Sequence, residues 1–340
     1  MRSAKVIVMG VVCVTVLVAA LPLSTEPVKL NVPKGWPTPV YELKEGALTR
    51  EGIDLGRRLF HDPILSKDST ISCSSCHLSY TAFSHVDHKL SHGIRDSIGT
   101  RNAPALMNLA WNRTFMWDGA VNHLDVQALA PIEHKAEMGE ELSHVVMKLQ
   151  RNERYRLLFR SAFGDGPVTG EHLLKALAQF QLTLICIGSK YDRVMNSAEA
   201  FTDQEANGYR LFVANCSSCH AEPLFTDGSF RNNGLAPDSV LRDGGRIRIT
   251  HEAKDSLCFK VPSLRNVEFS YPYMHDGRFK NLRDVIAHYM GGIHRSNTLA
   301  KELEKPIVLT SNERTDLLAF LLTLTDRDFL LNPAHATPMN

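Results

Sequence analysis

Two short motifs with the same residue types and spacing are the part of the sequence best suited to chemistry. They read Cys73-Ser74-Ser75-Cys76-His77 and Cys216-Ser217-Ser218-Cys219-His220. Two thiols three positions apart lie on one helical turn and can form thioethers to the two vinyl groups of a haem. The histidine that follows can then ligate the iron. The pattern predicts two covalently bound c-type haems, with His77 and His220 as proximal ligands.

A structural zinc site and a dithiol redox pair are the alternatives for such cysteines. Zinc sites normally combine one C-x-x-C pair with a second ligand pair at structural spacing, and thioredoxin-like chemistry uses one motif within a βαβ pattern. Neither context surrounds these motifs. Two further cysteines, Cys186 and Cys258, are either buried thiols or partners in a disulfide bridge.

The segments that precede the two motifs resemble each other. Gly56-Arg57-Arg58-Leu59-Phe60 comes before the first motif, and Gly208-Tyr209-Arg210-Leu211-Phe212 comes before the second. Self-similarity of this kind predicts two units of the same design, with a longer connection in the first copy. We place an N-terminal haem domain at residues 25–198 and a C-terminal haem domain at residues 199–340, whose last helix could pack back on the first domain.

Helical patterns dominate the chain around these motifs. Capping boxes at Thr202–Glu205 and Thr310–Glu313 predict two helix starts, and the second is followed by an apolar run at 317–322. Leucine-rich helical periodicity also begins at Glu140 and at Glu171. Alternating strand patterns are scarce. We therefore expect an all-α fold of two cytochrome c-like haem domains with long loops, in which the first and last helices of a domain pack together.

Composition and the N-terminus narrow the class of protein. The 340 residues are 44% hydrophobic, with 38 basic and 37 acidic side chains, which excludes collagen, coiled coils, low-complexity disorder and multi-span membrane proteins. The balanced charge gives no indication of nucleic acid as a partner. Arg2 and Lys5 precede an uncharged stretch that ends at Leu23, so residues 1–24 are predicted to be a signal peptide, or alternatively an uncleaved anchor. Both place the globular part in the periplasm.

The sequence resembles the bacterial di-haem cytochrome c peroxidases and their MauG-type relatives, over essentially all of the mature chain. The matching segments are 55–63, 101–106, 116–119, 137–139, 259–266 and 271–277. The resemblance implies that the haem at His77 handles hydrogen peroxide and that the haem at His220 exchanges electrons with a small c-type cytochrome or cupredoxin. A homodimer is common in such families.

The resemblance also implies roles for side chains of the first site. Glu137 matches the acid/base residue that moves a proton during O–O cleavage, and Gln127 and Pro131 match other residues of that pocket. Trp117 matches a tryptophan between the haems that relays electrons. The structural alternatives are a solvated helix charge for Glu137 and a core anchor for Trp117.

A calcium ion is implied between the two haems. Asn102, Ser270 and Pro272 match the positions that bind it, through one side chain and two backbone carbonyls. Calcium accepts such neutral oxygen ligands. His275 matches a position near the second haem, where we interpret it as a supporting residue and not as a ligand.

Each distal iron ligand has more than one candidate in the sequence. Among the loop histidines His85, His88 and His92, the last is the best match to a switchable ligand of the first haem. At the second haem, Tyr289 stands where peroxidases have methionine and MauG-type enzymes have tyrosine, and Met290 is the alternative. A thioether raises the reduction potential of a haem, whereas a phenolate stabilises oxidised iron.

Three functions remain open at this stage. The leading hypothesis is a peroxidase that reduces hydrogen peroxide to water with electrons from the small redox protein. The alternative is a MauG-type enzyme that oxidises side chains of a partner protein. A non-catalytic electron-transfer cytochrome comes third, because it would have no use for Glu137.

Overall fold

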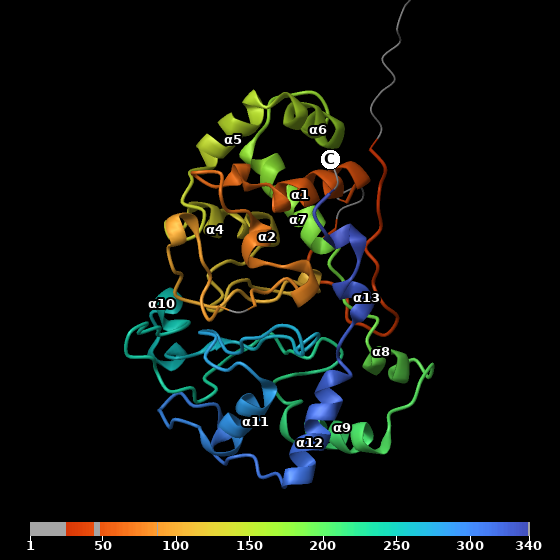
Figure 1. Cartoon of the computed structure of the whole chain (residues 1–340), viewed down its shortest axis with the longest axis vertical. Coiled ribbons are helices and arrows are strands. Elements are labelled where there is room, and N and C mark those ends of the chain that lie inside the picture. Colours follow the sequence, from red (N-terminus) through yellow and green to blue (C-terminus); the bar gives the residue numbers. More distant parts are fainter. Residues whose placement is uncertain (1–24, 44–47, 87, 339–340) are drawn as a thin grey trace, which may run out of the picture.

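Helices form most of the regular structure in the computed structural model, which describes residues 25–43, 48–86 and 88–338 (Figure 1). The helices of the first half are α1 (Arg50–His61), α2 (Cys73–Cys76), α3 (Leu124–Gln127), α4 (Leu129–Glu133), α5 (Leu142–Arg151), α6 (Glu153–Phe163) and α7 (Gly170–Leu182). The second half contains α8 (Lys190–Met195), α9 (Asp203–Asn215), α10 (Ile247–Thr250), α11 (Leu282–Gly291), α12 (Ser311–Leu322) and α13 (Arg327–Leu330). Single 3-10 turns lie at Pro63–Leu65, Ser79–Thr81, Ile94–Asp96, Leu109–Trp111, Ala253–Asp255, Lys301–Leu303 and Pro333–His335.

One small sheet accompanies the helices. Strands β1 (Phe230–Arg231) and β2 (Phe259–Lys260) pair in antiparallel register, with Phe230 opposite Lys260. The described part of the chain is therefore mostly helical, with this single pair of named strands. The predicted signal peptide, residues 1–24, lies outside the described residues. Within them, no helix has the length and hydrophobicity that crossing a membrane requires.

The predicted helix starts are confirmed. Thr202 precedes α9 and accepts a hydrogen bond from the backbone of Glu205 at 3.2 Å, and Thr310 precedes α12 and accepts one from Glu313 at 3.3 Å. The helical patterns that begin near residues 140 and 171 are α5 and α7. Helices α7, α9 and α12 each follow a threonine whose side chain caps the helix, whereas α5 follows Glu141, which makes no capping hydrogen bond.

Both halves are built on a pair of crossing helices. In the first half α1 packs against α7, and in the second half α9 packs against α12, as predicted for the terminal helices of a cytochrome domain. Gly56 and Gly208 lie at the two crossings. A methyl group at Gly56 would overlap the carbonyl of Ala176, and one at Gly208 would overlap the carbonyl of Asp316. The repeated glycine therefore allows the backbones of two helices to approach closely.

Two hydrophobic cores correspond to the two halves. The first contains buried residues from Leu48 to Cys186, and the second contains buried residues from Tyr191 to Leu324. Phe329 and Leu330 of α13 belong to the first core although they follow the second one in sequence. The domain boundary between residues 198 and 199 stays a prediction.

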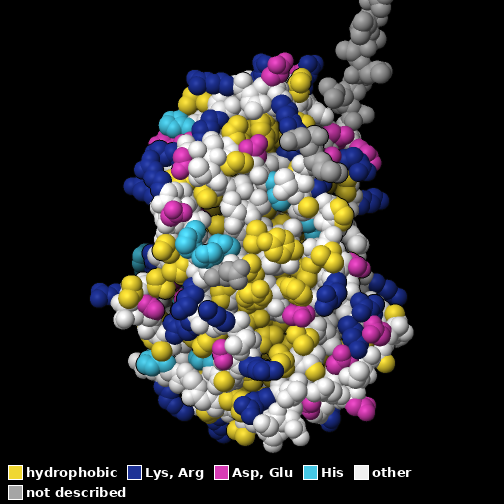
Figure 2. Space-filling model, viewed as in Figure 1, with side chains coloured by type: hydrophobic (Ala, Val, Ile, Leu, Met, Phe, Trp, Pro, Cys, Tyr) yellow, Lys and Arg dark blue, Asp and Glu magenta, His cyan; other side chains and the backbone are white. Residues whose placement is uncertain are grey.

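The surface carries both signs of charge. Figure 2 shows one face, on which basic and acidic side chains are mixed over both halves and hydrophobic side chains gather across the middle. This distribution matches the near-equal numbers of basic and acidic residues in the chain. No single-sign field dominates this face.

The helix crossings give a first prediction, about stability. Gly56→Ala and Gly208→Ala should each lower the free energy of unfolding by about 1–3 kcal/mol, because the added methyl groups force backbones apart. Gly291→Ala is the matched control, since nothing lies within 4 Å of a methyl group at that helical glycine. Denaturant unfolding of the haem-loaded proteins measures the change. Equal stability of all three variants would contradict the proposed close approach.

Candidate active site

The first cysteine motif forms the one-turn helix α2, and its histidine follows directly. The backbone N–H of Ser72 donates to the Ser75 hydroxyl at 3.0 Å, which fixes the start of the turn. The backbone N–H of His77 donates to the carbonyl of Cys73 at 2.9 Å. This bond keeps the chain helical through the motif, so the two cysteines and the histidine all project from one turn.

The second motif has the same hydrogen bond without forming a separate helix. It follows α9 as a turn, in which the backbone N–H of His220 donates to the carbonyl of Cys216 at 2.9 Å. The sequence repeat therefore corresponds to a repeated local geometry, and each motif follows the helix that carries the repeated glycine of its half.

Each motif histidine is held by a backbone carbonyl. Nδ1 of His77 lies 2.6 Å from the carbonyl oxygen of Phe83, and Nδ1 of His220 lies 3.1 Å from the carbonyls of Phe225 and Pro262. Because a carbonyl only accepts hydrogen bonds, Nδ1 must carry the proton, which leaves Nε2 with a lone pair. Burial lowers the pKa of both imidazoles, that of His77 to about 4. Both rings are therefore neutral and suited to ligate a metal.

Phe83 and Phe225 are functional positions that sequence reasoning missed. Both are fully buried, and their φ angles are +57° and +55°, in the left-handed region that bulky residues rarely adopt. This conformation accompanies the inward orientation of each carbonyl toward the histidine. Phe83 lies six positions after its histidine and Phe225 only five, so the repeat is out of register at this point.

The donor set fits two c-type haems. The four motif cysteines are free thiols, not disulfides, and each pair is followed by a neutral imidazole whose Nε2 is available. Burial raises the pKa of Cys73 and Cys216 to about 12. Cys186 and Cys258 are also free and buried, so the disulfide bridge considered for them is not formed in this structure.

Glu137 lies beside the first motif. It follows α4, and its carbonyl accepts a hydrogen bond from the backbone of Ile94 at 2.8 Å. Its carboxylate is 34% exposed and lies 3.5 Å from Nδ1 of His134. Burial raises the pKa of this carboxyl, and the charge of His134 opposes the shift. The backbone of Glu137 lies against Gly93, and the carbonyl of the preceding His92 accepts from the Cys76 thiol, so Glu137 is near the motif. Burial and the charge of Glu137 raise the pKa of this thiol to about 11.

His92 adjoins the same motif through its backbone. The thiol of Cys76 donates to the carbonyl of His92 at 3.4 Å. The ring of His92 contacts that of His88 at 4.5 Å between centroids, and His88 in turn stacks on His85 at 5.0 Å. The structure thus brings Glu137 and the histidine loop to one motif. The role of His92 as a distal ligand stays a prediction.

Gln127 and Pro131 lie on the short helices that lead to Glu137. Gln127, at the end of α3, directs its amide toward the sulfur of Met116 at 3.9 Å. The carbonyl of Pro131, in α4, accepts a hydrogen bond from Met138 at 3.2 Å. These contacts support the turn that presents Glu137, and the predicted pocket roles of both residues stay predictions.

Trp117 connects the two halves. Its indole N–H donates to the carbonyl of Asn102 at 2.8 Å, and its own carbonyl accepts the backbone N–H of Lys260 in β2 at 2.7 Å. Asn102 in turn donates its backbone N–H to the carbonyl of His275 at 2.7 Å. The ring of His275 stacks on Phe259 at 3.6 Å. Trp117 therefore lies in the junction between a segment of the first half and two segments of the second.

Ion pairs reinforce this junction. The Arg101 guanidinium binds both oxygens of Asp243 at 2.6 and 2.9 Å and one oxygen of Asp118 at 2.6 Å. Arg246 donates to the carbonyl of Asp118 at 3.0 Å and packs on the ring of Phe230. Since Asp118 follows Trp117 directly, these contacts also fix the tryptophan backbone.

Tyr289 and Met290 have different surroundings. Tyr289 hydrogen-bonds the side chain of Asn233 and lies close enough to Cys216 and Cys219 for their charges to act on its hydroxyl, whose pKa burial raises to about 12. Met290 instead packs against the second hydrophobic core. The Tyr289 hydroxyl is therefore held by Asn233 near the second motif, while Met290 packs against the core that Cys216 also adjoins.

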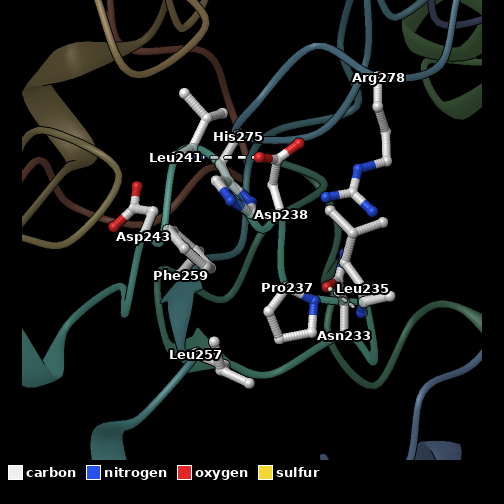
Figure 3. Close-up of a pocket in the computed structure, with 11 residues that line it drawn as sticks. Asn233, Leu235, Pro237, Asp238, Leu241, Asp243, Leu257, Phe259, His275 and Arg278 are labelled. Carbon is white, nitrogen blue, oxygen red and sulfur yellow. Dashed lines mark hydrogen bonds between the residues drawn. The ribbon is translucent and has the colours of Figure 1, made fainter.

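A pocket lies next to this site in the second half (Figure 3). Asn233, Phe259, His275 and Arg278 contribute to its lining. Asn233 also accepts a hydrogen bond at its carbonyl from Nε2 of His288 at 3.0 Å. Asn233 thus contacts both His288 and Tyr289, and holds the last turn of α11.

Comparisons with known proteins agree with this geometry. The family model for "Di-haem cytochrome c peroxidase" matches residues 50–200, and the model for "Cytochrome c" matches residues 205–325. The methylamine utilization protein MauG of Methylorubrum extorquens is 36% identical to this chain, covering 85% of the chain and 82% of the relative. The chain belongs to the di-haem cytochrome c peroxidase family.

Other members of the family are similarly close. Cytochrome c551 peroxidase of Nitrosomonas europaea is 34% identical, over 84% of both chains. Among solved structures, a MauG-like protein associated with microbial copper homeostasis is 30% identical, with a TM-score of 0.83 over 92% of this chain and 99% of that chain. Cytochrome c domains imply haem c cofactors, in agreement with the two motifs.

The calcium ligands implied by the family resemblance come from two segments, one in each half of the chain. Asn102 is buried, and its side-chain amide donates to the carbonyl of Lys89 at 3.2 Å. Ser270 and Pro272 lie between Phe269 and Tyr273, a segment that connects the core of the second half to His275. Calcium at these residues stays a prediction.

Lys260 gives a second prediction, about pH. Its ammonium group donates to the carbonyl of Thr114 at 2.9 Å, and burial lowers its pKa from 10.5 to about 8. Between these values the unfolded chain binds more protons than the folded one, so stability rises with pH, by at most about 3 kcal/mol. Lys260→Met should remove this rise.

The measurement is the free energy of unfolding of wild type and variant across this pH window. The exposed Lys280 provides the control, because Lys280→Met should leave the rise intact. A difference between wild type and Lys260→Met that stays constant with pH would show that the ammonium group has no perturbed titration.

Proposed function

We propose that this protein is a peroxidase that reduces hydrogen peroxide to water. Electrons come from a small c-type cytochrome or cupredoxin, enter at the second haem and pass to the first. The single observation that carries the proposal is a partly buried carboxylate, Glu137, next to the first haem-attachment motif. Relatives that are named cytochrome c peroxidases support it.

The residues divide the chemistry between two sites. Cys73 and Cys76 would hold one haem and Cys216 and Cys219 the other, with His77 and His220 as proximal ligands. When bound, the first haem supplies the iron that binds and reduces peroxide, and the second supplies one-electron transfer. The Phe83 and Phe225 carbonyls orient the two imidazoles and increase their basicity.

Glu137 moves the proton that the reaction requires. Peroxide reduction consumes two electrons and two protons and yields two water molecules. The carboxylate takes a proton from the oxygen that stays and returns it to the oxygen that leaves, as a general base and then a general acid. Burial raises its pKa, which brings it closer to neutrality and makes both steps accessible.

Trp117 suits the transfer of electrons between the sites. Its ring is fixed by the Asn102 carbonyl and its backbone by Lys260, so one aromatic group is held rigidly at the junction of the two halves. We assign it as a relay. The proposal has three further parts. The chain is exported to the periplasm and loses residues 1–24, it binds one calcium ion at Asn102, Ser270 and Pro272, and it forms a homodimer.

The proposed function predicts the effect of Glu137→Gln. This variant keeps the shape of the side chain but cannot accept a proton, so kcat/KM for peroxide should fall by about 10²- to 10⁴-fold. Steady-state oxidation of a reduced cytochrome c measures it, and visible spectra should show both haems unchanged. Glu133→Gln, at an exposed carboxylate one turn earlier, is the matched control. Full activity of Glu137→Gln would remove the basis of the proposal.

The position of Tyr289 favours a second candidate function. A phenolate ligand stabilises oxidised iron, which suits an enzyme that takes two electrons from a side chain of a partner protein and passes them to peroxide. The relatives named MauG make this a MauG-type alternative. A two-step peroxide titration distinguishes the two functions. Peroxide is first added without an electron donor, and a long-lived oxidised state at this step favours the alternative. Reduced cytochrome c is then added, and rapid return to the starting spectrum favours the peroxidase.

The ligand assignment can be tested separately. Tyr289→Met should raise the reduction potential of the second haem, because a thioether replaces a phenolate. Met290→Leu should leave it unchanged, since Met290 packs in the core. Spectroelectrochemistry measures both. The opposite pattern would assign Met290 as the ligand and weaken the MauG-type alternative.

A further inference from the structure

The last segment of the chain returns from the second half to the first. We call residues 326–338 the tail. It contains α13, and Figure 1 shows it running from there toward α1 and α7. Asp326 fixes its beginning, because one carboxylate oxygen accepts the backbone N–H groups of Ile187 and Gly188 at 2.9 and 2.7 Å. Beyond this anchor, Phe329 enters the first hydrophobic core.

Two rings of the tail pack on Phe83. Phe329 lies 6.0 Å and His335 5.6 Å from the Phe83 ring, and the two tail rings are 4.8 Å apart. His335 is 4% exposed, and its Nδ1 donates to the carbonyl of Phe329 at 2.8 Å. The tail thus presents a preformed pair of rings to Phe83.

Helix α1 holds the tail from its other side. The guanidinium group of Arg57 donates to the carbonyls of Pro333 and Ala336 at 2.7 and 2.8 Å. Nε2 of His61 donates to the carbonyl of His335 at 3.1 Å. With Asp326 at one end and these bonds at the other, the segment that contacts Phe83 is fixed at both ends.

Phe83 transmits this packing to the proximal histidine. Its backbone is in the left-handed region, which a phenylalanine keeps only when its surroundings hold it there. The remaining sides of its ring are covered by Phe60 at 5.8 Å and Phe180 at 6.4 Å. Its carbonyl lies 2.6 Å from Nδ1 of His77. A shift of the Phe83 ring would therefore move the acceptor of this hydrogen bond.

The second half uses the same arrangement without the tail. Phe225, which accepts from His220, is packed by Tyr191 at 4.7 Å, Phe212 at 5.4 Å and Phe320 at 6.4 Å. All three belong to the second hydrophobic core. Among the described residues, the rings that pack on Phe83 include two from a segment that arrives from the other half, whereas those that pack on Phe225 come from the second core.

We propose that the tail is a positioning element for His77. By packing on Phe83 it fixes the carbonyl that accepts the Nδ1 proton, and so sets how strongly His77 donates electrons to its metal. This inference rests on the proposed function, in which His77 is the proximal ligand of the first haem. It extends that function by making the reactivity of the first site depend on residues after the second.

The expected effect has a definite direction. When the tail packing is lost, the hydrogen bond from Nδ1 weakens and the imidazole becomes a poorer donor. The reduction potential of the first haem should then rise and its ferrous iron–histidine stretching band should move to lower frequency. The second haem should keep its potential, because its own phenylalanine is packed locally.

The experiment compares His335→Ala and the milder Phe329→Leu with Leu331→Ala in the haem-loaded protein. Leu331 belongs to the same tail but is 73% exposed, so its substitution tests for a general effect of altering the segment. Spectroelectrochemistry of both haems and resonance Raman spectra of the reduced protein are the readouts. Phe329→Leu provides the answer if His335→Ala does not fold.

The possible results test the role of the tail and the proposed function separately. A shift at the first haem alone, in His335→Ala or Phe329→Leu and not in Leu331→Ala, supports the tail as a positioning element. Unchanged potential and stretching band, or equal shifts at both haems, overturn it. If wild type lacks a histidine-ligated haem at the first motif, the proposed function itself fails before the variants are compared.

Discussion

The structure depends on one hydrogen bond made twice, from Nδ1 of a motif histidine to a backbone carbonyl. This bond fixes the tautomer, so that Nε2 remains available to a metal, and it requires a carbonyl that turns into the core. Phe83 and Phe225 supply it at the cost of an unfavourable left-handed backbone. The buried aromatic clusters around both residues hold that backbone conformation, so core packing and metal chemistry are linked at the same two positions.

The junction between the halves follows a different rule, because it is polar and buried. The partly buried Arg101 is neutralised by the buried carboxylates of Asp118 and Asp243. Breaking such a pair leaves an uncompensated charge, which is strongly destabilising. The ion pairs therefore fix the position of the segment around Trp117, because any other position would separate its charged neighbours from their partners. A tryptophan held this way has a defined position relative to both motifs.

Sequence patterns predicted what is local. The two motifs, the capping threonines and the amphipathic helices each occupy a few consecutive residues, and all were recognisable without a structure. The repeated glycines were visible too, but the reason for them is a carbonyl more than a hundred positions away. The return of the last helix to the first domain was expected from the sequence, and Phe329 and Leu330 do belong to the first core. Phe83 and the Arg101 network were missed because partners such as Phe329 and Asp243 are distant in sequence and the residue types are common. Tyr289 and Met290 could not be separated by sequence, since the distinction lies in which face of α11 meets the second motif.

Duplication explains why two sites of one design can differ in behaviour. Each half has the same helix crossing, the same motif and a phenylalanine carbonyl at Nδ1 of the motif histidine, and His220 has the carbonyl of Pro262 as a second neighbour. The two sites differ in the groups beside the motifs. The carboxylate of Glu137 lies near the first motif, and the phenol of Tyr289, hydrogen-bonded to Asn233, lies near the second. The outer support differs as well, because Phe225 is packed by its own core and Phe83 by a segment from the other half. The two halves therefore differ outside the helix crossing and the motif, and the tail completes the packing around Phe83 with residues that follow the second half.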